Sequence, residues 1–288
     1  MMQAATTPDT RRIDVMFQRL KREGRPAFVT YTVASDPSFE ASLVLMHRFV
    51  ASGIDLIEIG HPFSDPILDG ATIQKANIRG LAAGGNLTRT LELCAAFRQT
   101  DTTTPLVLMG YANPLAVMGY ERFAERAAAA GVDGLIAGDF PLREANALLD
   151  ALAEQGIFMI PMAAPTLEAK DFTSDHPAVG GFLYCIPVVG PTGGPSASID
   201  AIAQGVARCR EVSTLPVMVG FGVKTPKMAA DVGQVADGVI VATALIDTFQ
   251  AVLDCGDKDL GDKDGDAFLD YVAEQISLYR TAIDASSK

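Results

Sequence analysis

Eight short apolar segments, each followed by a stretch with helical periodicity, dominate this chain of 288 residues. Such alternation predicts parallel strands joined by helical crossovers. The expected strands are residues 27–33, 54–59, 105–109, 134–137, 157–160, 181–186, 215–220 and 238–242. Eight strand–helix units are the number that closes a TIM-type (β/α)8 barrel, and the length suits a single barrel domain over residues 1–288.

The helical stretches include two that lie outside the eightfold pattern. An extra helix is expected at residues 11–23, and a C-terminal helix should dock on the barrel through one apolar face. That face carries Phe268, Val272, Ile276, Tyr279 and Ile283. The crossover helices are expected to open at residue 38 and close at 53, and then to cover 72–83, 88–100, 120–130, 143–155, 166–173, 198–212, 224–232 and a stretch from 243.

An open, doubly wound sheet is the structural alternative to the barrel. The chain has no GxGxxG motif after its first predicted strand, so a dinucleotide site of that kind lacks support. The barrel also places the chemically informative residues at the carboxyl ends of strands, which is where barrel active sites lie.

Composition excludes several functional classes. The net charge of −12 argues against general attraction to nucleic acid or to an anionic membrane. The sequence has no apolar stretch near 20 residues and no apolar signal core at its N-terminus. The four cysteines are scattered and the three histidines lack ligand spacing, so we expect no metal site, no disulfide framework and a cytoplasmic location.

An acidic stretch near the C-terminus begins like a calcium loop. Residues 254–266 read DCGDKDLGDKDGD, but Ala267 and Ala273 stand where the loop requires glycine and glutamate. A solvated linker is therefore expected there rather than a calcium site.

Two carboxylates mark the strongest candidate for chemistry. Glu58 interrupts the apolar run 54–59, and Asp69 lies in the loop rich in Pro, Ser and Asp that follows. A carboxylate at the end of a buried strand loses solvation, so its pKa should rise and its proton becomes usable near neutral pH. An acid of raised pKa beside one that stays ionised suits proton transfer. A buried glutamate with a structural partner is the alternative.

Small residues form candidate phosphate-binding turns late in the chain. Residues 220–223 read GFGV, residues 241–244 read VATA, and Thr192-Gly193 lies in the Pro/Gly-rich loop after the sixth strand. Backbone N–H groups at such turns and at helix N-termini bind phosphate without lysine. In barrels this site recurs after strands seven and eight, so the three turns together predict a phosphate anchor.

Several segments of the sequence, including the one with Glu58 and Asp69, resemble a known family. The run GHPFSDPILDGATIQKAN (60–77), with Glu58 before it and Asp69 within it, looks like the signature of the tryptophan synthase alpha chain family. The resemblance extends over nearly the whole chain. It includes FVTYTVASDP (28–37), LMGYANP (108–114), GVDGLIAGDFP (131–141), PTGG (191–194) and VGFGVKTP (219–226).

The resemblance implies a retro-aldol cleavage of indole-3-glycerol phosphate to indole and glyceraldehyde 3-phosphate. Glu58 would be the general acid/base that protonates indole C3, and Asp69 would accept a hydrogen bond from the indole N–H. Tyr184, near the glutamate, would be the third catalytic residue. Substrate-binding positions would be Tyr31, Tyr111, Thr192, Gly193, Phe221, Gly222, Ala242 and Thr243. A core aromatic with a satisfied hydroxyl is the alternative for each tyrosine.

The resemblance also implies a partner. Indole would pass to a beta chain that carries pyridoxal phosphate, in an α2β2 heterotetramer, and the alpha chain itself would need no cofactor. The loop 62–69 and the loop after the third strand would face that partner. A stand-alone lyase that releases indole, or a regulatory partner without catalysis, are the alternatives.

Three positions depart from the family pattern. Pro187 and Val188 stand where many members have Ser-Arg, Ala242 stands where Gly is common, and His61 replaces a small aliphatic residue. The first change bears on loop closure, the second on phosphate affinity and the third on the partner interface.

Overall fold

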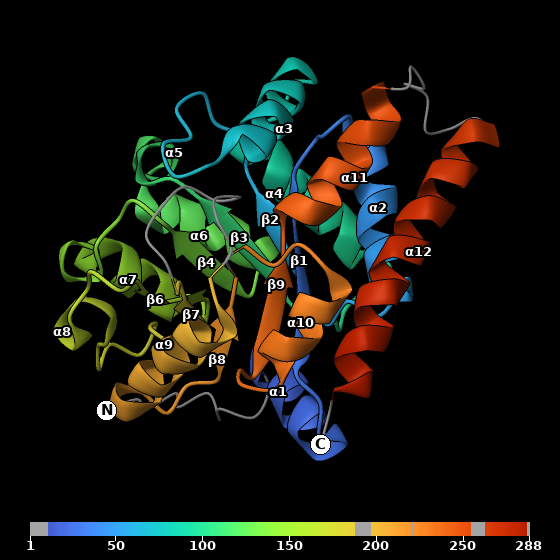
Figure 1. Ribbon diagram of the computed structural model, residues 1–288. Helices are drawn as coiled ribbons and strands as arrows, with labels where there is room; N and C mark the ends of the chain where they lie inside the picture. Colours follow the sequence, from blue (N-terminus) through green and yellow to red (C-terminus); the bar gives the residue numbers. More distant parts are fainter. Residues whose placement is uncertain (1–10, 188–196, 221, 255–262, 287–288) are drawn as a thin grey trace.

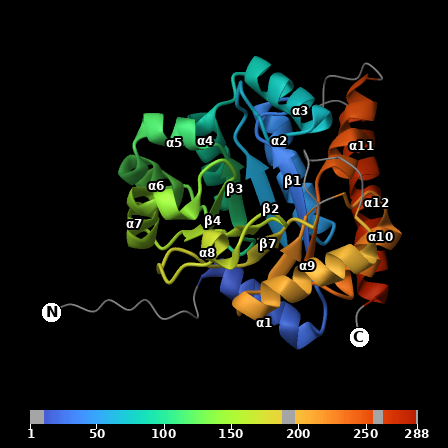
Figure 2. The same ribbon diagram turned by 60° about the vertical axis from the view of Figure 1, so that its left-hand side comes forward.

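The computed structural model describes residues 11–187, 197–220, 222–254 and 263–286 (Figures 1 and 2). Within these residues nine parallel strand segments form one sheet, in the order β5-β4-β3-β2-β1-β9-β8-β7-β6. The strands are β1 (Ala27–Val33), β2 (Leu56–Gly60), β3 (Leu106–Gly110), β4 (Gly134–Ala137), β5 (Phe158–Met159), β6 (Met162–Ala163), β7 (Leu183–Cys185), β8 (Val217–Val219) and β9 (Gly238–Val241).

The sheet closes because β5 and β6 are two halves of one strand position. Pro161 has no N–H to donate, which explains the interruption between them. On one side Ile160 N donates to the Leu135 carbonyl at 2.8 Å, and on the other Tyr184 N donates to the Pro161 carbonyl at 2.9 Å. The predicted strand 157–160 therefore continues past Pro161. The barrel prediction is confirmed, and the open doubly wound alternative is wrong.

The helices surround the strands in both views (Figures 1 and 2). They are α1 (Arg12–Glu23), α2 (Phe39–Ala51), α3 (Ala71–Ala82), α4 (Leu87–Arg98), α5 (Ala112–Met118), α6 (Tyr120–Ala129), α7 (Asn146–Glu154), α8 (Ala169–Phe172), α9 (Ile199–Val212), α10 (Pro226–Gly233), α11 (Thr243–Asp254) and α12 (Lys263–Ala285). One 3-10 turn, η2 (Leu142–Glu144), precedes α7.

Two predictions about helices need correction. No helix is expected from the sequence at residues 112–118, but they form α5; Pro114 is tolerated because it lies in the first turn, where no intrahelical N–H bond is needed. The acidic stretch 254–266 was expected as a linker, but α12 begins within it at Lys263.

Two apolar layers hold the barrel together, one inside the sheet and one between the sheet and its helices. Alternate residues of each strand point to opposite faces. In β2, for example, Leu56 belongs to the inner cluster, whereas Ile57 and Ile59 belong to the outer one. Burial on both faces explains why the strands read as nearly continuous apolar runs.

Helix α1 covers the amino ends of the strands. Its Ile13, Met16 and Leu20 join the inner cluster beneath β1. In both views α1 lies below the strands and α3 lies at the opposite end (Figures 1 and 2).

An aspartate directly before each of three strands anchors this amino end. Asp55, Asp133 and Asp237 precede β2, β4 and β9. Each accepts a hydrogen bond from the first residues of the neighbouring strand, at 3.0 Å from Phe28 N, 2.8 Å from Leu106 N and 2.8 Å from Val217 N. Each also pairs with at least one arginine. These carboxylates align the starts of adjacent strands, far from the carboxyl rim.

The C-terminal helix docks as predicted. All five residues of its predicted apolar face are at most 5 % exposed. The Tyr279 ring stacks on Phe28 at 6.1 Å, and its hydroxyl donates to the Lys224 carbonyl at 2.9 Å. Among the described residues, no helix is long and apolar enough to cross a membrane.

Candidate active site

Glu58 lies on β2, near its carboxyl end, with its side chain on the inner face of the barrel. It follows Leu56 by two residues, which places both on the same face, and it is register partner to Tyr31 on β1. The whole residue is only 1 % exposed. The carboxyl group is therefore held inside the barrel at its carboxyl end.

The Glu58 carboxyl group is almost fully shielded from solvent. Its Oε1 atom has no hydrogen-bond partner among the described residues. Burial alone raises the pKa of Glu58 from 4.5 to about 8, because the charged form loses its hydration. At neutral pH the group is mostly protonated, and it can act as an acid.

Asp69 lies in the turn that leads into α3. Its Oδ2 atom accepts a hydrogen bond from Asn77 Nδ2 at 3.2 Å, and Tyr111 also hydrogen-bonds the carboxylate. Burial raises the pKa of Asp69 to about 6, and the bonds from Tyr111 and Asn77 limit the rise. At pH 7 Asp69 is mostly ionised while Glu58 is mostly protonated. The two carboxyl groups therefore differ in charge at the pH where both could work.

Tyr31 lies among the other candidate residues. Burial raises its pKa well above the ordinary value, and the nearby Asp69, Tyr111, Glu58 and Tyr184 raise it further. These electrostatic contacts show that the fold brings the five predicted side chains to one place, although they come from β1, β2, β7 and two loops.

Two glycines make room for two of these tyrosines. A Cβ atom on Gly60 would lie 2.1 Å from the Tyr31 hydroxyl, and one on Gly220 would lie 2.1 Å from the Tyr184 hydroxyl. The Tyr184 hydroxyl also donates to the Gly220 carbonyl at 2.9 Å. Tyr184 thus links β7 to the turn after β8, where the phosphate anchor is expected.

Tyr111 connects the loop after β3 with the loop after β2. Its hydroxyl accepts a hydrogen bond from Leu68 N at 3.2 Å and also bonds Asp69. Burial raises its pKa beyond the ordinary range, and the Asp69 charge adds to the rise. Tyr111 therefore holds the segment that carries Asp69 against the strand ends.

His61, expected from the sequence to bear on the partner interface, is also a buried neighbour of the site residue Tyr111. It is only 2 % exposed, and its Nε2 atom accepts a hydrogen bond from Tyr111 N at 3.3 Å. The ring packs on Gly110, where an added Cβ would lie 1.9 Å from Nε2. Burial lowers its pKa to about 4, so the ring is neutral at pH 7. Gly110, which leaves room for the ring, is the sequence signal for this burial. Its position opposite His61 becomes evident only from the pairing of β2 with β3.

The turn after β9 also reaches this rim. Ala242 packs with Tyr31, Ile73 and Ile246, and its carbonyl accepts hydrogen bonds from Leu245 N and Ile246 N, each at 3.1 Å. Helix α11 begins at Thr243, so N–H groups of its first turn have no partner within the helix. This helix N-terminus can accept an anion beside the carboxylates.

The remaining phosphate candidates are only partly described. Gly222 has a φ of 70°, a left-handed conformation that favours glycine. Thr192, Gly193 and Phe221 lie outside the described residues. Within the described part of the chain, no group of three or more His, Cys, Asp or Glu side chains could hold a metal ion.

Fold and site together define the class of α/β-barrel enzymes, with two carboxyl groups of different pKa at the carboxyl rim. The chain matches the family model described as tryptophan synthase alpha chain over residues 17–264. It belongs to that family, and the resemblance noted from its motifs is confirmed.

Curated relatives and solved structures agree with this assignment. The tryptophan synthase alpha chain of Caulobacter sp. (strain K31) is 49 % identical over 240 residues, covering 83 % of this chain and 87 % of the relative. That of Granulibacter bethesdensis is 44 % identical over 271 residues, covering 94 % and 97 %. The crystal structure of tryptophan synthase subunit alpha from Legionella pneumophila str. Paris superimposes with a TM-score of 0.86 at 37 % identity, covering 96 % and 99 %.

Proposed function

We propose that this chain is a tryptophan synthase alpha subunit that cleaves indole-3-glycerol phosphate to indole and glyceraldehyde 3-phosphate. The observation that carries the proposal is the pair of carboxyl groups near Tyr31, Glu58 with a pKa raised to about 8 and Asp69 with a pKa of about 6, at the rim where α11 begins. A helix N-terminus for the phosphate and two carboxyl groups in opposite charge states meet what this substrate and its cleavage require.

In the proposed reaction, Glu58 donates its proton to indole C3. Asp69 accepts a hydrogen bond from the indole N–H and stabilises the positive charge that develops on the ring. The bond between C3 and the glycerol carbon then breaks, and its electron pair returns to the indole ring. The glycerol hydroxyl loses its proton to the Glu58 carboxylate and becomes the aldehyde, so the acid is regenerated. The proton transfers and the bond cleavage need no cofactor, and we assign none to this chain.

A partner surface fits the same end of the barrel. Ile67 and Leu68 in the loop after β2, and Val117 in α5, are 73 %, 36 % and 81 % exposed. Exposed large apolar side chains on the loop after β2 and on α5 suit a protein interface. We propose that these loops contact a beta chain that carries pyridoxal phosphate. The α2β2 stoichiometry and the cytoplasmic location remain predictions.

The substitution Glu58→Gln tests the mechanism. It removes the proton donor and keeps the side-chain volume, so cleavage of indole-3-glycerol phosphate should fall at least about a hundredfold, with folding retained. The matched control is Glu154→Gln on α7, where the glutamate is exposed. Near-normal turnover of the Glu58→Gln chain would contradict the proposed role.

The alternatives are separated by steady-state indole release with and without a beta chain. Strong activation by the beta chain supports the subunit function, and full activity alone supports a stand-alone lyase. Indole release at the uncatalysed rate under both conditions would point to a regulatory partner without catalysis.

A further inference from the structure

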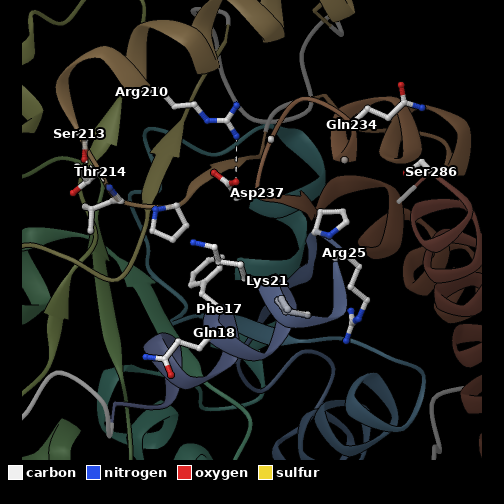
Figure 3. Close-up of a pocket in the computed structure, with 17 residues that line it drawn as sticks. Phe17, Gln18, Lys21, Arg25, Arg210, Ser213, Thr214, Gln234, Asp237 and Ser286 are labelled. Atoms are coloured by element: carbon white, nitrogen blue, oxygen red, sulfur yellow. Dashed lines mark hydrogen bonds and ion pairs between the residues drawn. The ribbon is translucent and has the colours of Figure 1, made fainter. Parts of the chain in front are cut away.

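A second cavity lies at the opposite end of the barrel from Glu58. It has a volume of about 700 Å³ and is lined by α1 and by the segments that lead into β1, β8 and β9 (Figure 3). Pro26, Pro216 and Asp237 directly precede these three strands. The cavity is therefore at the amino ends of the strands, and the proposed catalytic function does not use it. Its volume is typical of small-molecule sites.

Positive charge enters the cavity from two helices. The ammonium group of Lys21 on α1 has no ion-pair or hydrogen-bond partner among the described residues, and the side chain extends between Phe17 and Asp237 in Figure 3. Arg210 of α9 points inward, is half exposed, and holds Asp237 by one nitrogen at 3.2 Å. The remaining donors of both side chains are available to a carboxylate, in a protein whose net charge is −12.

Negative charge comes from a separate part of the wall. The helices α1, α9 and α10 end at this cavity, because their C-terminal capping residues Gly24, Ser213 and Gln234 all line it. The negative ends of three helix dipoles therefore converge here. Asp237 adds a carboxylate, with Oδ2 accepting from Val217 N at 2.8 Å and free lone pairs on both oxygens. This side disfavours a dianion such as phosphate and favours an ammonium group.

The floor between the two charged regions is apolar. Phe17 and Leu20 of α1 line it together with Leu215 and Pro216. The Phe17 ring is braced by Phe182, with ring centroids 6.3 Å apart. A planar or branched apolar side chain of a ligand can pack on this floor while the charged groups of the ligand reach the two charged regions of the cavity wall.

We propose that this cavity binds a free α-amino acid with a large apolar side chain. Its carboxylate pairs with Lys21 and Arg210, and its ammonium group lies against Asp237 and the helix C-termini. Its side chain packs on the floor of Phe17 and Pro216. The two opposite charges and the apolar body of such a molecule match the three regions of the wall.

Calorimetric titration of the full chain with L-phenylalanine tests the site. We expect saturable binding, retained in Glu58→Gln and weakened about tenfold or more, roughly 1.4 kcal/mol, in Lys21→Glu and in Arg210→Gln. Both residues are solvent-exposed, so the variants should fold, and their unfolding midpoints verify this. Lys170→Glu, at an exposed lysine of α8, should bind as the parent does.

Three probes dissect the recognition. Phenylacetate lacks the ammonium group, phenethylamine lacks the carboxylate, and glycine lacks the apolar body; each should bind about tenfold more weakly than L-phenylalanine. Absence of saturable binding would overturn the proposal, as would undiminished binding to Lys21→Glu. Equal binding of phenylacetate would overturn the role of the negative wall. None of these measurements depends on the cleavage reaction, so the proposed function is tested separately.

Discussion

Tyr31 and Glu58 are register partners on the adjacent strands β1 and β2, and both side chains lie inside the barrel at its carboxyl end. The Tyr31 ring fills the space over Gly60 and helps to exclude water from the carboxyl group. An acid enclosed in this way keeps its proton at neutral pH, because ionisation would leave an unsolvated charge.

The stability of the protein should fall as pH rises from 6.5 to 8. Glu58 has a pKa of about 8 in the folded state and 4.5 when unfolded, so in this window the folded state binds more protons. The free energy of unfolding then decreases with pH, by up to roughly 1.4 kcal/mol per pH unit. His61 contributes the opposite slope, but between its pKa of about 4 and 6.5, outside the window. Urea unfolding at a series of pH values measures the effect.

The same measurement on two variants assigns the slope. Glu58→Gln has no proton to lose and should flatten the profile between pH 6.5 and 8, whereas Glu154→Gln should keep it. An unchanged slope in Glu58→Gln would mean that another group is responsible.

Tyr111→Phe should move the acid limb of the pH profile. The Tyr111 hydroxyl lowers the pKa of Asp69 by a hydrogen bond, so its loss should raise that pKa from about 6. If cleavage needs ionised Asp69, the acid limb of kcat/KM shifts to higher pH, by up to roughly one unit. Tyr271→Phe, at a tyrosine that is 43 % exposed, is the control. A limb that stays in place would exclude Asp69 ionisation as its origin.

Gly60→Ala should destabilise the protein through Tyr31. The new Cβ atom would lie 2.1 Å from the Tyr31 hydroxyl oxygen and 2.8 Å from the ring, so the ring must move. Overpacking of this kind costs about 1–3 kcal/mol. Tyr31→Phe removes the closest atom, and the double variant should recover part of the loss. Thermal unfolding of the two single variants and the double variant forms the test, and strict additivity would show that the two residues are not coupled.

Asp133→Asn should reduce stability while sparing the catalytic end. The carboxylate accepts from Leu106 N at 2.8 Å and pairs with Arg12 and Arg98, each at 2.8 Å. Removing its charge leaves the largely buried Arg98 with only the weaker pair to Asp101 at 3.9 Å, so the loss should approach the roughly 3–5 kcal/mol of a broken buried ion pair. Asp231→Asn breaks only a surface pair with Lys227 and should cost less than about 1 kcal/mol. A large loss of kcat in folded Asp133→Asn would contradict the separation of the two barrel ends.

Much of the fold followed from local pattern. The strand over residues 27–33 was predicted with its observed bounds, because an apolar, β-branched run can hardly be anything else. The helix at 112–118 is not evident from the sequence, because it spans only seven residues and carries Pro114 in its first turn, which a helix accepts. The split at Pro161 was missed as well, since it depends on which strands lie on either side.

The sequence by itself determined the succession of strands and helices, and with it the end of the barrel where Glu58 and Asp69 had to lie. Side-chain periodicity is a local property, and parallel strands bring all their carboxyl ends to one rim. Only the tertiary structure decided the state of those groups. Contacts between segments distant in the chain determine the pKa of Glu58 near 8, the burial of His61 against Gly110 and the charged cavity that α1 lines. Desolvation and charge pairing act through space, so no pattern along the chain specifies them.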